Sequence, residues 1–518
     1  MMAHVMRDEV EGVVEQSSVP AREAEAPTVF AADVGSSSVR AALFDARGRE
    51  VEGTAAQVVR DFHAGRDGGA EESPEALLAD AERTFDAAHE KVAALKVGVG
   101  AVAVACFWHS LVGVDAAGAA ATPVYGWADT RAVCEVVRLA RTFDERAAHA
   151  RTGCPFHTAY WPAKLLWLKD ARPEIFSATA RWMSFGEFAV ERWCGARPAA
   201  ASVSMASGTG LFDSRRLAWD EELTAGLGLG VGQLSPVASD DHVFGLTTEY
   251  AARWPALRGA PVFAPVGDGA ANNVGAGCVT RERAALMVGT SAAMRVMFEG
   301  GPPRELPPAL WCYRADSRRV IVGGALSDGG GLHEWMRETL RLSVDAAELE
   351  AELAAVGPDS HGLTVLPYWA GERSTNWDAH ARGAILGLRA STRPAEILRA
   401  AMEAIALRLA AVADALEEFA PGAEVHASGG ALRQSRVWTQ IVADALGRTV
   451  LRSRAREASC RGVALLALER LGALKSLTDA PAPTYETFAP DGQAHARYRG
   501  ALARQQSLYE SVLHGSRQ

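Results

Sequence analysis

The chain has 518 residues, which is enough for two to four domains. Its content of 48% hydrophobic and 22% charged residues is ordinary for a globular protein. A formal net charge of -10 argues against a general nucleic-acid binder, although it is compatible with a local basic site for an anionic ligand. The seven cysteines are odd in number and form no CxxC pair, so we expect reduced thiols, a cytoplasmic location, and neither a disulfide framework nor a structural zinc site.

The first 27 residues are acidic and lack the apolar core of a signal peptide, and we expect them to form a mobile tail. No run in the chain approaches the ~18 apolar residues that span a bilayer. The sequence therefore predicts no membrane partner, and it leaves open whether the chain forms a homodimer.

A predicted β-hairpin, VFAADVGSSSVRAALFDARGREV, occupies residues 29–51. Asp33 lies near the end of its first strand and is followed by a tight turn of small residues: Gly35, Ser36, Ser37 and Ser38. The backbone N–H groups and hydroxyls of such a turn can hold phosphate oxygens, and the carboxylate of Asp33 can hold the accompanying magnesium ion. A solvent-exposed hairpin with small turn residues explains the pattern equally well.

The first half continues as a mixture of strands and helices, which predicts an α/β domain. Ser73-Pro74 begins a predicted helix through residue 95, and VGAVAVACFW reads as a buried strand. LVGVDAAGAAATPVYGW predicts two strands joined by a turn, PAKLLWLKDARPEIF and FGEFAVERWCG predict helices, and GAPVFAPVGDGAANNVGAGCV predicts strand, turn and helix.

The second half repeats this opening in outline. RAALMVGTSAAMRVMFEG predicts a second hairpin, and RRVIVGGALSDGGGLHEWMRETL predicts a strand, a glycine turn and a helix. Long helices are predicted over 393–419 and 435–446, with a strand and glycine turn between them, and another near the C-terminus. We expect a domain boundary near residues 280–284, which gives an N-terminal domain over 28–280 and a C-terminal domain over 281–518. Two such domains facing each other would form a cleft.

Asp268 is the strongest candidate for a catalytic residue. It follows an apolar strand and precedes a predicted helix, and the edge of the sheet at such a junction is where α/β proteins bind ligands. Phosphoryl transfer needs a carboxylate that orients the attacking hydroxyl and accepts its proton. On local sequence alone, an N-cap aspartate is the favoured alternative.

Three further turns of small residues are candidate phosphate or nucleotide sites, because a ligand can approach the backbone closely there. None is a Walker A sequence or a complete dinucleotide-binding fingerprint, and tight packing turns are a serious alternative. The turns are Gly289-Thr290-Ser291, Gly330-Gly331 and Gly429-Gly430-Ala431.

Several segments together resemble the FGGY carbohydrate kinase family, which belongs to the actin-like sugar kinase superfamily. They are DVGSSSVR, GDGAANNVGAG, VGTSA, GGALSDGGGLHEW, PYWAGERSTNWDAHARGAILGL, ASGGALRQSRVWTQIVADALGRTV and EASCRGVALLAL. The resemblance covers roughly residues 29–468. It implies an α/β fold of two ribonuclease H-like domains, each a mixed sheet flanked by helices, with a cleft between them.

The resemblance also implies ATP and Mg²⁺ as cofactors and assigns roles to individual residues. Asp268 would be the catalytic base, and Asp33 and Asp268 would lie at the metal. The implied ATP-binding residues are Gly35, Ser36, Ser37, Ser38, Arg40, Gly289, Thr290, Ser291, Gly330, Gly331, Gly429, Gly430, Ala431 and Ser435.

Within the family the chain looks most similar to gluconate kinases, in the segments FWHSLVGVD, YGWADTRA, TGCPFH and PAKLLWLK. The implied substrate-binding residues are His109, Trp127, Asp129, Arg131, His157, Asp268 and Gly269. The carboxylate of a sugar acid would favour a basic partner such as Arg131 or Lys164.

The exact sugar stays open, because Trp108, the STNW segment at 374–377 and the aromatic pair in TAYWPA depart from the pattern of close relatives. A kinase for xylulose or another polyol is the first alternative. A nucleotide-dependent switch on the same fold is the second, since a fold does not determine a function.

Overall fold

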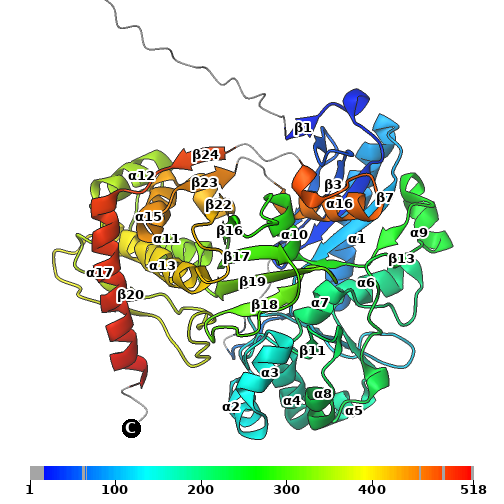
Figure 1. The fold of residues 1–518 in the computed structure, drawn as a ribbon, viewed down its shortest axis with the longest axis horizontal. Coiled ribbons are helices and arrows are strands. Elements are labelled where there is room, and N and C mark those ends of the chain that lie inside the picture. The colour runs from blue at the N-terminus through cyan, green and yellow to red at the C-terminus, as the bar shows by residue number, and fades with distance from the viewer. Residues whose placement is uncertain (1–16, 61–64, 66, 454–456, 481–484, 515–518) are drawn as a thin grey trace, which may run out of the picture.

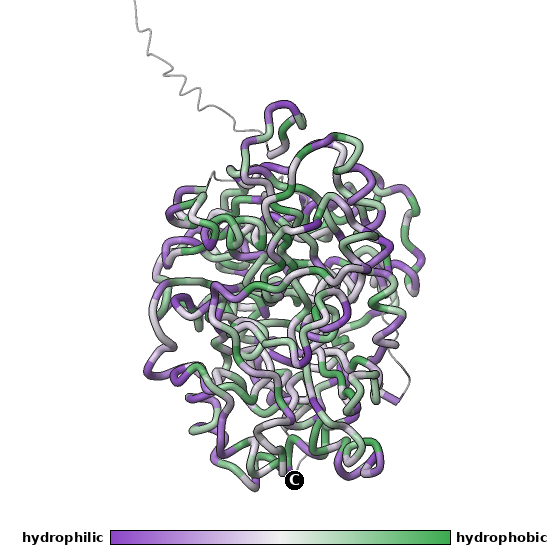
Figure 2. The backbone as a smooth tube through the Cα atoms, turned by 90° about the vertical axis from the view of Figure 1, so that its right-hand side faces the viewer, coloured by the Kyte–Doolittle hydropathy of each residue, from purple (hydrophilic) through white to green (hydrophobic). Residues whose placement is uncertain are grey.

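The computed structural model describes residues 17–60, 65, 67–453, 457–480 and 485–514. Two mixed β-sheets, each covered by helices, form the framework, and a largely helical cluster extends from the first sheet. Figure 1 shows the second sheet with α17 beside it on the left and the first sheet on the right. The hydrophobic segments run through the interior, and the hydrophilic ones gather toward the periphery (Figure 2).

The first sheet has nine strands, and its main path runs in the order β1-β4-β3-β2-β7-β14-β13, with β5 on β3 and β15 on β7. Its strands are β1 (Ser18–Val19), β2 (Val29–Val34), β3 (Ser38–Phe44), β4 (Glu50–Val51), β5 (Ala56–Val59), β7 (Ala101–Cys106), β13 (Val243–Phe244), β14 (Val262–Phe263) and β15 (Val266–Gly267).

The predicted opening hairpin is confirmed. β2 and β3 pair antiparallel with Asp33 opposite Arg40, and the Gly35 N–H donates to the Ser38 carbonyl across the turn (3.0 Å). The start of the predicted helix is also confirmed, because Ser73 caps α1 (Pro74–Leu95) by accepting from the Ala76 N–H. The apolar runs that predicted β2 and β7 are buried in this sheet.

Residues between β7 and β13 form most of the helical cluster. Much of it packs around its own buried side chains, whereas residues 185–194 join the core of the first sheet. Its helices are α2 (Val133–Thr142), α3 (Glu145–Thr152), α4 (Trp161–Ala171), α5 (Pro173–Ala178), α6 (Phe185–Cys194), α7 (Val203–Ser207) and α8 (Glu221–Leu227), and α9 (Thr248–Arg253) follows β13. Short two-stranded sheets join β8 (Val112–Val114) to β10 (Arg181–Met183), β6 (Glu71–Glu72) to β9 (Val124–Tyr125), and β11 (Phe212–Asp213) to β12 (Ala218–Trp219).

The second sheet has seven strands in the order β18-β19-β17-β16-β22-β23-β24. They are β16 (Arg283–Val288), β17 (Ala292–Glu299), β18 (Trp311–Arg314), β19 (Arg319–Leu326), β22 (Glu424–Ser428), β23 (Val450–Ser453) and β24 (Tyr485–Phe488). The predicted repeat is confirmed in the strand pairing. β2 pairs antiparallel with β3 and parallel with β7, and β16 likewise pairs antiparallel with β17 and parallel with β22.

The helices of the second half pack mainly with this sheet. They are α11 (Gly330–Thr339), α12 (Ala346–Ala355), α13 (Pro394–Leu416), α14 (Gly430–Gln434), α15 (Arg436–Leu446) and α17 (Gly492–Tyr509), and the short strands β20 (Thr364–Leu366) and β21 (Ala384–Leu386) pair beside α17. The long helices predicted from the apolar pattern over 393–419 and 435–446 correspond to α13 and α15.

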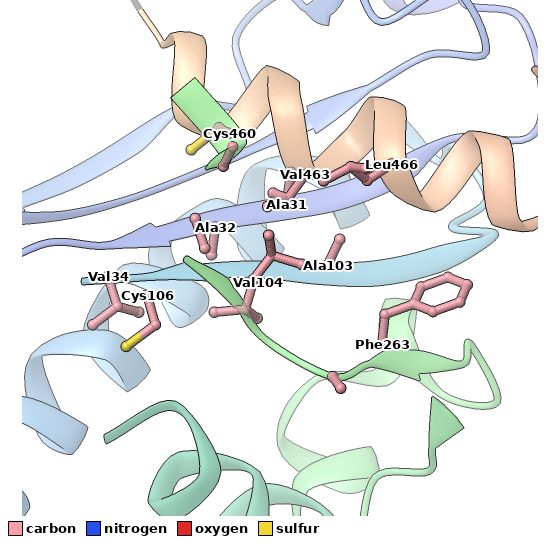
Figure 3. Packing of buried hydrophobic residues seen from close by; sticks show 14 of the residues in the cluster. Ala31, Ala32, Val34, Ala103, Val104, Cys106, Phe263, Cys460, Val463 and Leu466 are labelled. Atoms are coloured by element: carbon pink, nitrogen blue, oxygen red, sulfur yellow. The ribbon is translucent and has the colours of Figure 1, made fainter. Parts of the chain in front are cut away.

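One helix of the second half, α16 (Ala458–Arg470), packs on the first sheet instead. Figure 3 shows Cys460, Val463 and Leu466 of this helix lying over Ala31 and Ala32 of β2. The helix also crosses α10 (Asp268–Gly275), the helix that begins with the candidate base. The chain therefore returns to the first sheet after the second has been built, which a single boundary near residues 280–284 does not describe.

Glycines allow α10 and α16 to cross with their backbones in contact. A Cβ atom on Gly275 would overlap the carbonyl oxygen of Ala458, and one on Gly462 would overlap that of Ala271. The overlap would be with backbone, so no change of rotamer could relieve it.

The predicted N-terminal tail over 1–27 needs a correction. Residues 1–16 lie outside the described part of the chain, but Ser18–Val19 forms β1 and pairs with β4. Val19 is buried, so this apolar side chain ties the segment to the sheet. Among the described residues, no helix is both long and apolar enough to cross a membrane.

Candidate active site

Asp33 and Asp268 lie at the same edge of the first sheet. β2 and β15 both run parallel to β7 and flank it, with Asp33 opposite Ala105 and Gly267 opposite Cys106. Because neighbouring strands are about 4.8 Å apart, the backbones that carry the two carboxylates are separated by roughly 10 Å. Two carboxylates that converge from the carboxyl ends of parallel strands can share one cation between them.

Asp33 carries a buried oxygen, Oδ1, that has no hydrogen-bond partner among the described residues. Burial, together with the negative charge of Asp268, raises the pKa of Asp33 to about 7. A carboxylate with an unsatisfied buried oxygen is costly unless a ligand compensates it.

Asp268 is the first residue of α10, and Gly267 occupies the N-cap position. The reading of Asp268 as an N-cap is therefore wrong. Its Oδ1 accepts from the Gly269 N–H (2.8 Å) and the Trp108 N–H (3.4 Å). These contacts use one oxygen, so the carboxylate is held in place and can still accept a proton.

Two opposing effects act on the pKa of Asp268. Burial raises it, and the nearby guanidinium of Arg295 on β17 is the largest influence that lowers it. Arg295 is itself buried, donates from Nη2 to Asn272 Oδ1 (3.2 Å), and has its pKa lowered to about 10 by burial. Arg295 was not predicted from the sequence, because it lies in the middle of an apolar strand.

The candidate nucleotide turns of the second half converge. The Gly330 N–H donates to the Gly289 carbonyl (2.6 Å), and the Gly331 N–H donates to the Thr290 carbonyl (3.0 Å). A Cβ on Gly330 would also lie 3.3 Å from Cβ of Ala431. Residues from three separate turns thus form one continuous, mostly half-buried surface, and this convergence agrees with the phosphate interpretation.

Gly429 is essential to that surface. Its φ of +100° is left-handed, and a side chain there would overlap the carbonyl of Val288. The neighbouring Gly430 begins α14, whereas Ser435 caps α15 by accepting from the Trp438 N–H (2.9 Å). The hydroxyl of Ser435 therefore has a structural partner in this conformation.

In the first hairpin turn, Gly35 and Ser36 are half-buried, Ser37 is exposed and Ser38 is buried. Arg40 on β3 forms an ion pair with Glu457, just before α16 (3.5 Å). The basic residue next to this turn is thus linked to the second half of the chain.

Trp108 and His109 lie directly beside Asp268. The Trp108 indole donates from Nε1 to the Ser204 carbonyl (2.9 Å) and fills the space beside Gly267 and Gly269, where a Cβ would overlap it. His109 has a positive φ of 67°, and its Nδ1 donates to the Gly208 carbonyl (2.5 Å). Burial lowers the pKa of His109 to about 3, so the ring is neutral and Nε2 is an acceptor.

Aromatic side chains from both halves meet around His109. The hydroxyls of Tyr160 and Tyr313 are 2.6 Å apart, and both rings contact His109 edge to face. His157 lies against Trp377, accepts at Nδ1 from the Ala159 N–H, and donates from Nε2 to the Glu372 carbonyl (3.0 Å). The sequence placed His109 and His157 in one site, and the structure brings both to this aromatic cluster.

Asp129 and Arg131 form a structural pair instead. Arg131 donates to Asp129 (2.5 Å for the shortest contact) and to Glu71, and it stacks on Trp167. Lys164, the other predicted partner for a carboxylate, donates from Nζ to the carbonyls of Thr158 and Ala159. These cations already have protein partners.

Trp127 does reach the second half of the chain, where the guanidinium of Arg373 stacks on its ring (4.3 Å to the centroid). Arg373 is buried and lies in the GERSTNWD segment. The sequence resemblance included this segment without assigning a role to its arginine.

Comparisons with known proteins agree with this architecture. Residues 28–275 match the model of the FGGY family of carbohydrate kinases, N-terminal domain, and residues 284–469 match the model of the C-terminal domain. A gluconokinase of Bacillus subtilis (strain 168) is 28% identical over 381 residues, or 71% of this chain and 74% of the relative. A glycerol kinase of Aromatoleum aromaticum is 32% identical over 460 residues, or 85% and 89%.

Solved structures give the same result. A gluconate kinase from Lactobacillus acidophilus superposes with a TM-score of 0.84 at 25% identity, covering 94% of this chain and 98% of that one. A ligand-bound xylulose kinase from the same organism has a TM-score of 0.85, also at 25% identity and the same coverage. The predicted α/β fold of two actin-like domains is confirmed, and the chain belongs to the FGGY family of carbohydrate kinases.

Proposed function

We propose that the protein transfers the γ-phosphoryl group of Mg-ATP to a hydroxyl of a sugar or sugar acid, with gluconate as the best candidate and Asp268 as the general base. One observation carries the proposal: Asp268 lies beside Asp33 at the edge of the first sheet, with one oxygen held by backbone N–H groups. Membership of a kinase family favours this over a nucleotide-dependent switch.

The residues present fit a magnesium ion. The orphaned Oδ1 of Asp33 and the neighbouring Asp268 offer the carboxylate oxygens that this hard cation prefers. Bound there with ATP, the ion would neutralise charge on the phosphate oxygens. The turn of Gly35–Ser38 and Arg40 would hold phosphates from the first half of the chain.

Phosphates would be held from the other side by Gly289, Thr290 and Ser291, and the nucleotide would contact Gly330, Gly331, Gly429, Gly430, Ala431 and Ser435. In this scheme residues 28–280 bind the sugar and residues 281–518 bind the nucleotide, with α16 as the exception already described. Such a kinase would work in the cytoplasm, where ATP is available.

For the sugar itself, we propose contacts with His109, Trp127, His157, Asp268 and Gly269. The neutral imidazoles can hydrogen-bond hydroxyl groups, and the aromatic rings can cover the C–H face of a polyol. Asp129 and Arg131 already hydrogen-bond each other, so we propose that they shape the sugar site rather than contact the sugar directly. The similarity to a solved xylulose kinase keeps that ketose as the second candidate.

The test is the mass-spectrometric identification of phosphorylated products after incubation with ATP, magnesium and a mixed pool of sugars and sugar acids. We expect a phosphorylated sugar acid. Phosphorylated xylulose without phosphogluconate would select the second candidate, and ATP hydrolysis with no phosphosugar would contradict the proposed kinase.

The nucleotide surface makes its own prediction. Replacing Gly330 with alanine should weaken the binding of a non-hydrolysable ATP analogue at least tenfold, because the new Cβ would lie only 2.6 Å from the Gly289 carbonyl and force the two turns apart. Gly301→Ala is the control, since nothing lies within 4 Å of its Cβ position. Calorimetric titration compares the variants, and equal affinities would contradict the assignment.

A further inference from the structure

Arg373 is a buried cation without a counter-ion. Only 8% of the residue is exposed, and among the described residues it forms no ion pair. Its Nε is buried and has no hydrogen-bond partner. A buried charge without a partner is strongly unfavourable, and proteins retain one where a ligand completes it.

Two contacts fix the direction of the guanidinium. Nη2 donates to the carbonyl of Leu326 (2.7 Å), the last residue of β19, and one face stacks on Trp127. A guanidinium with one face over an aromatic ring keeps its N–H groups in its own plane, where they can donate to a planar or tetrahedral oxyanion. A cavity of about 10 Å³, roughly the size of one water molecule, borders Arg373 and Ser327.

Among the described residues no carboxylate forms an ion pair with Arg373. Burial lowers the pKa of Arg373, although the negative charges of Asp328 and Asp268 oppose this effect by raising it. Glu372 accepts from the hydroxyl of Tyr509 (2.7 Å) and lies 3.8 Å from the guanidinium of Arg408. Asp328 accepts from the Ala370 N–H (3.0 Å). The side chain next to Arg373 in sequence is thus committed to a different arginine.

The position of Arg373 links the two proposed ligand sites. Leu326 leads into the Ser327–Gly331 turn on the nucleotide side, whereas Trp127 belongs to the proposed sugar side. The positive charge of Arg373 acts on Asp268, lowering its pKa, and on His157, whose pKa it also lowers. The guanidinium therefore lies near the point where the hydroxyl and the γ-phosphoryl group would meet.

We infer that Arg373 is an anion-binding residue of the active site, donating Nε–H and a free Nη N–H to oxygens of the reacting ligands. The inference rests on the proposed kinase function. The oxyanion that Arg373 binds is either the transferred phosphoryl group or the carboxylate of a sugar acid.

During transfer the bond from the γ-phosphorus to the bridging oxygen breaks with its electron pair left on ADP, the sugar oxygen bonds to phosphorus, and Asp268 takes the hydroxyl proton. Arg373 exchanges no proton and stabilises negative charge.

The experiment compares Arg373→Gln and Arg373→Lys with the wild-type protein. Turnover is measured with gluconate and with the neutral acceptor xylulose, and calorimetry measures binding of gluconate and of a non-hydrolysable ATP analogue. Arg382→Gln is the matched control, because this exposed arginine lies nearby in the chain and donates only to the Ala379 and Ala381 carbonyls. Melting temperatures separate loss of folding from loss of function.

We expect Arg373→Gln to lower kcat by roughly 10²–10³-fold with every acceptor that the wild type uses, as for loss of one oxyanion donor, and Arg373→Lys to recover part of it. A loss confined to gluconate, through KM and calorimetric affinity, would assign the carboxylate as the anion. Unchanged kinetics and unchanged binding of both ligands in Arg373→Gln would overturn the inference.

The outcomes also separate this inference from the proposed function. A wild-type protein that phosphorylates no sugar or sugar acid would refute the kinase. Binding of the ATP analogue and gluconate would then still test Arg373, because loss of affinity in Arg373→Gln but not in Arg382→Gln would show anion binding. An equal loss of affinity in Arg373→Gln and in the control Arg382→Gln would refute anion binding by Arg373.

Discussion

Asp268→Asn should lower the rate of sugar phosphorylation by roughly 10²–10⁴-fold, the range that a general base contributes. The amide keeps an oxygen that can accept from the Gly269 and Trp108 N–H groups, so the local structure should persist. What is lost is the ability to accept the hydroxyl proton. A coupled ADP assay with the phosphorylated sugar measures the rate, and calorimetry should show an ATP analogue still bound.

Asp115→Asn is the matched control. Asp115 is also half-buried and also accepts two backbone N–H bonds on Oδ1, from Ala117 and Ala119 (2.9 Å each), but it lies in a turn after β8. This variant should keep full activity. If Asp268→Asn turned over as fast as Asp115→Asn, Asp268 would not be the base.

The second large effect is on stability. Gly462→Ala should lower the free energy of unfolding by about 3 kcal/mol, at the upper end of the usual cost of overpacking, because its Cβ would overlap the Ala271 carbonyl at the crossing of α10 and α16. Forcing the helices apart would also displace α10, which begins at Asp268, so activity should fall even at temperatures where the variant is folded. Urea unfolding and the ADP assay measure the two losses.

Gly500→Ala provides the comparison. Gly500 lies inside α17 and nothing is within 4 Å of its Cβ position, so alanine should stabilise the helix by about 0.5–1 kcal/mol. If Gly462→Ala were as well tolerated as Gly500→Ala, the backbone contact between α10 and α16 would not be a constraint on the fold.

The local sequence was enough to predict many of the elements. Apolar runs bounded by turns identified β2, β3, β7, β16 and β17, and the Ser73-Pro74 pair identified the start of α1. Such signals depend on neighbours a few residues away, which is why a single sequence carries them. The family motifs added the candidate base and the glycine turns.

Prediction was weaker where a side chain has more than one suitable partner. Asp129 and Arg131 looked like substrate ligands, but they bind each other two residues apart. Lys164 looked available for a carboxylate, but it lies in the first turn of α4, where the carbonyls of Thr158 and Ala159 just before the helix accept from its Nζ. A polar side chain is used by the nearest buried partner, and the sequence does not show which partner that will be.

By itself, the sequence determined the family, the α/β class, the repeated hairpins and the identity of the strongest candidate base, because these follow from local patterns and motifs. Only the tertiary structure decided that α16 returns to the first sheet, that Asp33 and Asp268 flank β7 at one edge, and that Arg295 and Arg373 approach Asp268. The physical reason is that these arrangements join segments far apart in the chain. Their burial and charge exist only after long-range packing has excluded water.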